Sequence, residues 1–82
     1  MRNTGRKLRQ IREALGLSQS QMLKHLGAED LIDAYRISEF ETGKREPPLL
    51  IILLYARAAN VWMDVLVDDE MDLPAKLPAR RK

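Results

Sequence analysis

Cysteine is absent from all 82 residues of the chain. Its absence excludes a disulfide framework and cysteine-based metal sites, and it fits the reducing cytoplasm that we expect as the location. The longest uncharged apolar run, residues 49–56, is far shorter than the roughly 20 residues needed to span a bilayer. No signal-peptide layout is present at the N-terminus. These features predict a small cytoplasmic domain without a membrane partner.

Residues that usually carry catalysis or bind metals are few and scattered. His25 is the single histidine and is expected on a helix surface. Ser18 and Ser20 therefore lack the histidine base that activates a serine nucleophile. The acids within residues 68–72 do not have the spacing of a calcium loop, and no phosphate-binding glycine loop is present. We therefore expect no enzyme activity, no metal, no cofactor and no small-molecule substrate.

The net charge of +2 is unevenly distributed. Residues 1–12 contain five basic side chains and no acid, whereas residues 68–72 contain four acids. A basic end indicates a polyanionic partner only weakly, because a solvated helix face would explain the same charges. The basic residues are Arg2, Arg6, Lys7, Arg9 and Arg12.

Apolar periodicity and local start and stop signals predict an all-α chain of five helices. Ser18 and Gln21 have the spacing of a capping box. Thr4 and Asp33 are expected to cap two further helices with their side chains. Gly43 can end a helix in the left-handed conformation. The predicted helices span about residues 4–15, 18–27, 33–42, 49–59 and 61–67.

Two segments do not fit the helical pattern. We interpret the acidic residues 28–32 as a loop, with one extra helical turn as the alternative, because four apolar residues from Leu31 to Phe40 recur at intervals of three. The composition changes after Val67 to acids, two prolines and a basic end. The sequence thus predicts a helical domain over residues 1–67 and an extended or disordered tail over residues 68–82.

The third predicted helix has two different faces. At 100° per residue, Ile37, Phe40 and Glu41 lie on one side. Polar side chains lie on the other, and two basic residues follow the helix directly. Such a helix can pack its apolar side against a small core and present its polar side chains to a partner. The outward residues are Tyr35, Ser38, Glu39 and Thr42, and the basic residues are Lys44 and Arg45.

Three stretches resemble the phage repressor and Cro-like (XRE) helix-turn-helix family. They are Leu-Arg-Gln-Ile-Arg at residues 8–12, Gly-Leu-Ser-Gln at residues 16–19, and Ile-Ser-Glu-Phe-Glu-Thr-Gly-Lys-Arg-Glu-Pro at residues 37–47. The resemblance covers residues 5–67 and implies five packed helices, of which the third enters the DNA major groove. One departure is the acidic connection between Gly27 and Ile37, which is longer than the family's usual turn.

The resemblance also implies roles for individual residues. Gln19 matches a position that hydrogen-bonds a phosphate at the start of the second helix. In the third helix, Arg36 could pair with guanine or a phosphate, and Glu39 could accept from the cytosine amino group. Each of these residues could instead be a plain surface side chain, and Arg2, Arg6 and Arg9 are weaker phosphate candidates. The positions that match DNA contacts are Gln19, Tyr35, Arg36, Ser38, Glu39, Lys44 and Arg45.

An ion pair between Arg12 and Glu41 is a further expectation. Glu41 is on the inward side of its helix, where an unpaired carboxylate would be costly. Arg12 adjoins Ile11 on the core side of the first helix, and both positions match paired ones in the family. The alternative is two separate surface charges.

The fourth predicted helix is apolar on both of its faces. One arc is expected to face the core, and it consists of Leu49, Ile52, Leu53, Ala56 and Ala59. The opposite arc, which also contains Tyr55, has no role inside a single domain and therefore predicts a homodimer interface. The alternative is that Leu73 and Leu77 of the tail cover this patch. The predicted interface residues are Leu50, Ile51, Leu54, Ala58 and Trp62.

These features together favour a sequence-specific DNA-binding transcriptional regulator whose partner is double-stranded DNA. The alternative is a protein-interaction module on the same fold, such as an antitoxin or a coactivator-like adaptor. The acidic residues 28–33 and Glu39 favour the adaptor, whereas Gln19, Lys44 and Arg45 favour DNA.

Overall fold

The computed structural model describes residues 3–78 of the chain. This part contains five helices joined by loops, and no strand. The all-α, five-helix fold predicted from the sequence is confirmed. No helix within these residues has the length and apolar character to cross a membrane. The helices are α1 Thr4–Ala14, α2 Gln19–Leu26, α3 Ala34–Thr42, α4 Leu49–Ala59 and α5 Met63–Val67.

Local chemistry explains where most helices begin and end. Ser18 Oγ accepts a hydrogen bond from the Gln21 backbone N–H at 3.1 Å, and Gln21 Oε1 accepts from the Ser18 N–H at 2.8 Å. This reciprocal pair is the predicted capping box of α2. Gly27, Gly43 and Asn60 adopt φ of 69°, 80° and 58° just after α2, α3 and α4 (Leu49–Ala59). They are thus the left-handed residues that end these helices.

The two other expected side-chain caps are wrong. Asp33 occupies the N-cap position of α3, but its side chain makes no capping hydrogen bond. Thr4 is the first residue inside α1, and its buried hydroxyl donates to the Leu66 carbonyl oxygen at 2.7 Å. Because α5 packs beside the start of α1, a tertiary acceptor replaces the local one for Thr4.

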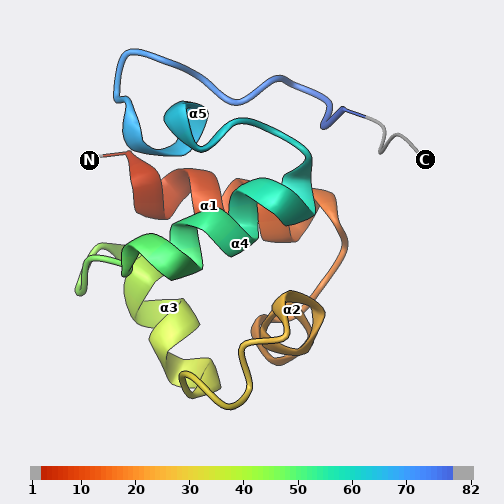
Figure 1. The fold of residues 1–82 in the computed structure, drawn as a ribbon, viewed down its shortest axis with the longest axis vertical. Coiled ribbons are helices and arrows are strands. Elements are labelled where there is room, and N and C mark those ends of the chain that lie inside the picture. Colours follow the sequence, from red (N-terminus) through yellow and green to blue (C-terminus); the bar gives the residue numbers. More distant parts are fainter. Residues whose placement is uncertain (1–2, 79–82) are drawn as a thin grey trace.

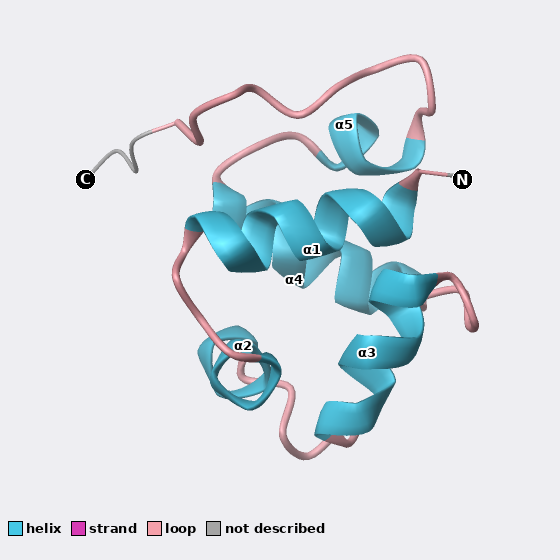
Figure 2. Cartoon of the chain, turned by 180° about the vertical axis from the view of Figure 1, so that it is seen from behind, coloured by secondary structure: helices cyan, strands magenta, loops and turns pink. Residues whose placement is uncertain are grey.

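α1 and α4 cross the middle of the molecule, with α2 and α3 at one end and α5 with residues 68–78 at the other (Figure 1). The reverse view in Figure 2 shows the same arrangement. Every helix contributes at least one buried side chain, so a single core joins both ends. The fully buried large apolar side chains are Leu8, Ile11, Met22, Ile37, Phe40, Ile51, Ile52, Tyr55 and Leu66.

Lys7 is buried rather than part of a basic surface, with 1% of its area exposed. Its Nζ donates to the carbonyl oxygens of Val65 at 2.7 Å, Asp68 at 2.9 Å and Met71 at 2.5 Å. These three bonds use all the donors of the ammonium group, which a buried lysine requires. Lys7 therefore fastens α5 and the following turn to α1, and it is not available to a polyanion.

Residues 68–78 contain no helix. Leu73 and Leu77 are partly buried against the core. They line a small hollow together with Gln10, Glu13 and Ala14 of α1, and Leu50 and Trp62 remain exposed. The tail therefore lies against α1 and leaves those two residues of the apolar patch uncovered. The division at residue 67 remains a prediction, and residues 1–2 and 79–82 lie outside the described residues.

The predicted outward arc of α4 is partly wrong. Ile51 and Tyr55 are buried, with 2% and 0% of their areas exposed, whereas Leu49, assigned to the core, is 65% exposed. α4 is thus rotated so that Ile51 and Tyr55 face inward. A helix that is apolar all round carries no periodic signal for its inward face, so the surrounding helices decide it. Leu50 is exposed, and Leu54 and Ala58 are partly buried.

Candidate nucleic-acid interface

α2 and α3 form the end of the molecule that is farthest from α5 (Figure 1). The connection between them is a loop with one hydrogen-bonded turn and not an added turn of α3, so the loop predicted from the sequence is confirmed. Buried Ala28 anchors this loop, and its carbonyl oxygen accepts from the N–H groups of Leu31 at 2.9 Å and Ile32 at 3.1 Å. The loop leaves Leu31 56% exposed among acidic neighbours.

Arg12 and Glu41 form a two-bond ion pair that joins α1 to α3. Arg12 Nε donates to Glu41 Oε2 at 2.7 Å, and Nη2 donates to Oε1 at 3.0 Å. The Glu41 side chain is only 3% exposed, and Arg12 also donates to the Leu17 carbonyl oxygen at 2.9 Å. The hydrogen bond to Glu41 is the main cause that raises the pKa of Arg12, against the opposing effect of burial. The pair fixes the angle at which α3 leaves the body of the domain.

Gln19 points toward this ion pair. Its Nε2 lies 3.4 Å from Glu41 Oε1, which makes it a long third hydrogen bond to the carboxylate. The first residue of α2 is thereby linked to α3. The side chain is partly exposed, so the same amide remains close to the surface that α2 and α3 share.

Tyr55 places a buried hydroxyl in the field of the same two charges. The hydroxyl has no hydrogen-bond partner among the described residues. Burial is the main cause that raises the pKa of Tyr55 far above its ordinary value, and the charge of Glu41 acts in the same direction while Arg12 opposes it. Tyr55 therefore stays neutral at any physiological pH.

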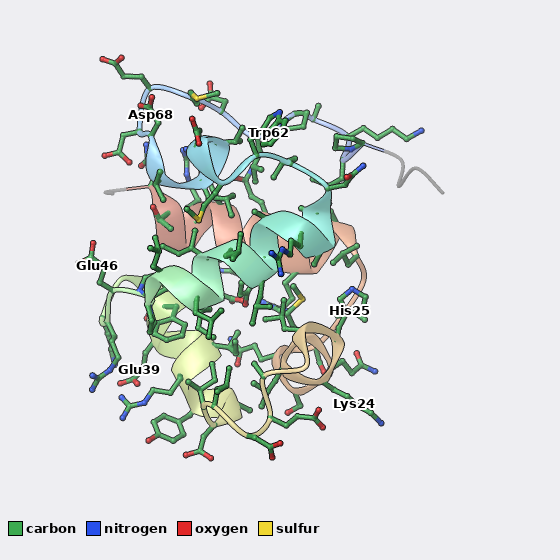
Figure 3. The ribbon with its side chains drawn as sticks, viewed as in Figure 1. Lys24, His25, Glu39, Glu46, Trp62 and Asp68 are labelled. Atoms are coloured by element: carbon green, nitrogen blue, oxygen red, sulfur yellow. The ribbon has the colours of Figure 1, made fainter. Side chains whose placement is uncertain are left out.

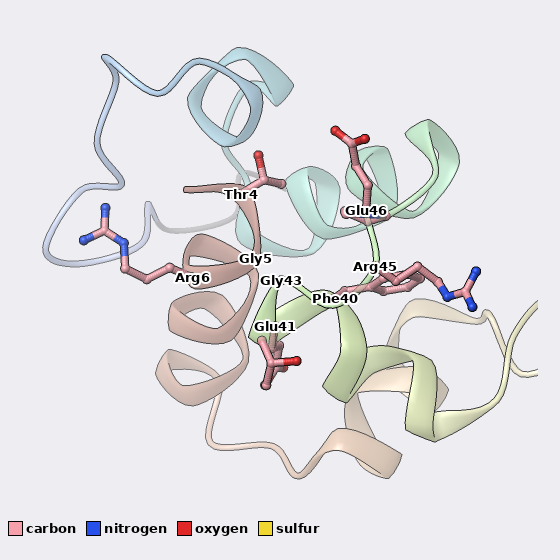
Figure 4. A pocket seen from close by; sticks show the side chains of 10 residues that line it. Thr4, Gly5, Arg6, Phe40, Glu41, Gly43, Arg45 and Glu46 are labelled. Carbon is pink, nitrogen blue, oxygen red and sulfur yellow. The ribbon is translucent and has the colours of Figure 1, made fainter. Parts of the chain in front are cut away.

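Gly5, which is not among the residues predicted from the sequence, allows α1 and α3 to approach closely. A Cβ atom at this position would lie 2.2 Å from the Phe40 carbonyl oxygen. Figure 4 shows Gly5 facing the end of α3, with Arg6 and Arg45 pointing away from the contact on opposite sides. A glycine inside a helix lowers its stability, so its presence in a helical pattern can indicate a close packing contact. This was the sequence signal available for Gly5.

The outward face of α3 presents a connected group of polar side chains. Tyr35 is 56% exposed, and its ring centroid lies 5.0 Å from the Arg36 guanidinium carbon, within cation–π range. Arg36 Nη1 donates to Glu39 Oε1 at 2.9 Å. Ser38 is partly exposed beside this group, and Glu39 is directed outward from the helix (Figure 3).

The loop after α3 carries the two basic residues that are predicted to contact phosphates. Lys44 and Arg45 are both exposed. Arg45 is tied to α3, because its N–H donates to the Glu39 carbonyl oxygen at 3.3 Å and its Nε lies 3.5 Å from Glu39 Oε1. Lys44 has no ion pair with any residue in the described range. The fold thus brings Tyr35, Arg36, Glu39 and Arg45 together.

The remaining basic candidates lie on α1. Arg6 is exposed. Arg9 pairs with Glu13 at 3.4 Å, where both side chains are more than half exposed. Arg2 lies outside the described residues. Arg6 lines one hollow with Arg45 at the end of α3, but no hydrogen bond or ion pair joins the described Arg6 or Arg9 to the group on α3.

Histidine and the acidic side chains form no constellation for metal chemistry. Within residues 3–78 no group of three potential metal ligands is close enough to hold an ion. His25 lies on the exposed side of α2, near Lys24 (Figure 3). The side chains that the fold does gather, on α3 and in the loop after it, are suited to hydrogen bonding and to pairing with negative charge.

Comparison with known proteins matches residues 4–69 to a family described as a helix-turn-helix domain. The match covers all five helices. Comparisons with curated proteins and with solved structures gave no significant match.

Proposed function

The chain belongs to the helix-turn-helix domain family, and from this premise we propose that it is a cytoplasmic, sequence-specific transcriptional regulator of the XRE type. In this proposal α3 enters the major groove of double-stranded DNA and reads base edges. The observation that carries the proposal is the outward group on α3, followed directly by the exposed basic pair Lys44 and Arg45. A polar helix face flanked by cations is the arrangement that base reading and phosphate binding need.

The proposed contacts divide into two kinds. Phosphate contacts position the domain without reading the sequence, and base contacts on α3 supply the specificity. Arg36 has the donor geometry to pair with guanine O6 and N7. We assign Gln19, Lys44 and Arg45 to phosphates, and Tyr35, Arg36, Ser38 and Glu39 to the base-reading face.

Removing the basic pair tests the phosphate contacts. The double substitution Lys44→Ala and Arg45→Ala should weaken binding to all duplexes by a similar factor, because phosphates are present at every sequence. The slope of log affinity against log salt should fall by about one unit per lost contact. Titrations at several salt concentrations measure both effects.

A matched control removes two exposed cations that lie away from α3, Arg57 and Lys76. The control has the same net charge as the test variant but keeps the proposed phosphate contacts, so its salt slope should remain near that of the wild type. Equal losses of DNA affinity in the two variants would contradict the assignment of Lys44 and Arg45 to phosphate contacts. A wild type without salt-dependent affinity for any duplex would favour an adaptor instead.

The adaptor function is the second candidate, and one surface feature favours it. Leu31 is 56% exposed in the loop that also contains exposed Glu29 and Asp30. An exposed leucine among acids suits a basic protein partner better than it suits DNA. We therefore keep an antitoxin or coactivator-like adaptor as the alternative.

We extend the proposal to a homodimer that forms through the outer face of α4 and the residue before α5. Ile51 is removed from the predicted interface because it is buried in the core. Leu50 is 51% exposed and Trp62 is 83% exposed, and Leu54 and Ala58 lie partly exposed on the same helix as Leu50. A two-fold pair could place its α3 helices in successive major grooves about 34 Å apart.

Leu50→Glu tests this interface better than a change at Leu54, which packs partly against the core. The new carboxylate would be desolvated in an apolar contact, so the variant should shift toward monomer while it stays helical. Analytical ultracentrifugation measures the change, and Ser20→Glu at an exposed position of α2, away from α4, is the control for one added negative charge. A wild type that is monomeric at high micromolar concentration would rule out the dimer.

A further inference from the structure

Glu39 is the centre of a small charged network on the outward face of α3. Its Oε1 accepts from Arg36 Nη1 at 2.9 Å and lies 3.5 Å from Arg45 Nε. The Glu39 carbonyl oxygen also accepts from the Arg45 backbone N–H at 3.3 Å. One carboxylate therefore engages two of the arginines that are proposed to touch DNA.

The contact between Arg36 and Glu39 is partly shielded from water, whereas the Arg45 side chain is 53% exposed. The side chains of Arg36 and Glu39 are 30% and 28% exposed, whereas those of the surface pair Arg9 and Glu13 are 59% and 56% exposed. The Tyr35 ring restrains the Arg36 guanidinium from a second side. Partial burial and this restraint make the contact between Arg36 and Glu39 less sensitive to salt than an ordinary surface pair.

A carboxylate and a phosphate offer an arginine similar acceptors, namely two charged oxygens in one plane. Glu39 thus gives Arg36 and Arg45 inside the protein what the DNA backbone would give them outside it. On a random duplex, an arginine that leaves the Glu39 carboxylate for a DNA phosphate gains little binding free energy. Where Arg36 meets a guanine, the exchange gains a two-bond contact with O6 and N7.

From this geometry we propose that Glu39 is a specificity-determining residue that competes with phosphate for Arg36 and Arg45. It lowers the affinity for random DNA more than the affinity for a site where Arg36 meets guanine. The inference rests on the proposed DNA-binding function. It differs from direct reading of cytosine by Glu39, because competition for the two arginines also lowers the affinity for duplexes that offer Glu39 no cytosine.

Glu39→Gln is the first test, with a random-sequence duplex as the probe. The amide keeps the shape of the side chain but loses its charge, so both arginines are released toward phosphates. Affinity for the random duplex should rise several-fold at low salt, and the salt slope should steepen by up to about two units, one for each released arginine. A cytosine reader would leave this slope unchanged.

Asp33→Asn is the matched control for loss of one negative charge at the same end of the molecule. Asp33 is exposed, directly precedes α3 and has no ion pair with a described residue. The control should raise the affinity less than Glu39→Gln does and should leave the slope near the wild-type value. Equal slopes for the two variants would overturn the inference, because bulk charge would then explain both.

Glu39→Asp supplies an independent variant that keeps the charge. The shortened carboxylate withdraws from the two arginines, so the salt slope should move toward that of Glu39→Gln. A salt slope equal to that of the wild type would overturn the proposal that Glu39 competes with phosphate for the two arginines. A wild type with no salt-dependent affinity would overturn the proposed function and this inference together, whereas wild-type binding with an unchanged slope in Glu39→Gln overturns the inference alone.

Discussion

Replacing Arg12 with alanine is expected to destabilise the folded domain by about 3–5 kcal/mol, the cost of leaving a buried charge unpaired. The Glu41 side chain is 3% exposed, and among residues 3–78 only Gln19, at 3.4 Å, would remain as a hydrogen-bond donor to it without Arg12. Glu41→Ala should cost less, because Arg12 is 15% exposed and retains its bond to the Leu17 carbonyl oxygen. Urea unfolding followed by circular dichroism measures both changes.

Two further variants decide whether burial is the cause. Arg9→Ala breaks a pair of the same type whose side chains are more than half exposed, and it should change stability by less than about 1 kcal/mol. The double variant Arg12→Met and Glu41→Leu should recover most of the loss, because apolar side chains of similar size can replace a buried pair. A cost for Arg12→Ala no greater than that for Arg9→Ala would contradict the structure of this contact.

The second large effect is expected at Gly5, where alanine should destabilise the domain by about 3 kcal/mol. Glycine to alanine inside a helix ordinarily stabilises it by about 0.5–1 kcal/mol, so the sign is reversed here. The added Cβ would lie 2.2 Å from the Phe40 carbonyl oxygen, and a backbone atom cannot move aside as the end of a flexible side chain can. The helices would have to separate, and α3 would change its angle.

Gln10→Ala is the control for Gly5→Ala, since Gln10 is exposed on the same helix. It should leave the melting temperature nearly unchanged. Because α3 moves, Gly5→Ala should also reduce DNA affinity at temperatures where the variant is still folded. A variant as stable as the wild type would show that α1 and α3 are packed less closely than the structure indicates.

Much of the fold could be predicted because helix ends depend on neighbouring residues. The capping box of Ser18 and Gln21 and the left-handed Gly27 and Gly43 need only local chemistry. The inward positions of Ile37 and Phe40 followed from helical periodicity. The resemblance to the XRE family added the pairing of Arg12 with Glu41.

The candidate site was predictable as a set of residues but not as a network. Periodicity placed Tyr35 and Glu39 on the outward side of α3, and chain order placed Arg45 just beyond the helix. Which side chains contact each other depends on rotamers and on the path of the loop, which sequence spacing does not specify. The bond from Arg36 to Glu39 and the approach of Arg45 to the same oxygen therefore became visible only in three dimensions.

The sequence by itself determined the five helices, the left-handed ends of α2 and α3 and the polar face of α3, because these depend on residues within one or two turns of each other. Tertiary structure alone decided the roles of Lys7, Gly5 and Ile51. The acceptors of Lys7 are 58 to 64 residues away, and the neighbour of Gly5 is the backbone of another helix. α4 is apolar on every side, so only the packing of α1, α2 and α5 around it could turn Ile51 inward.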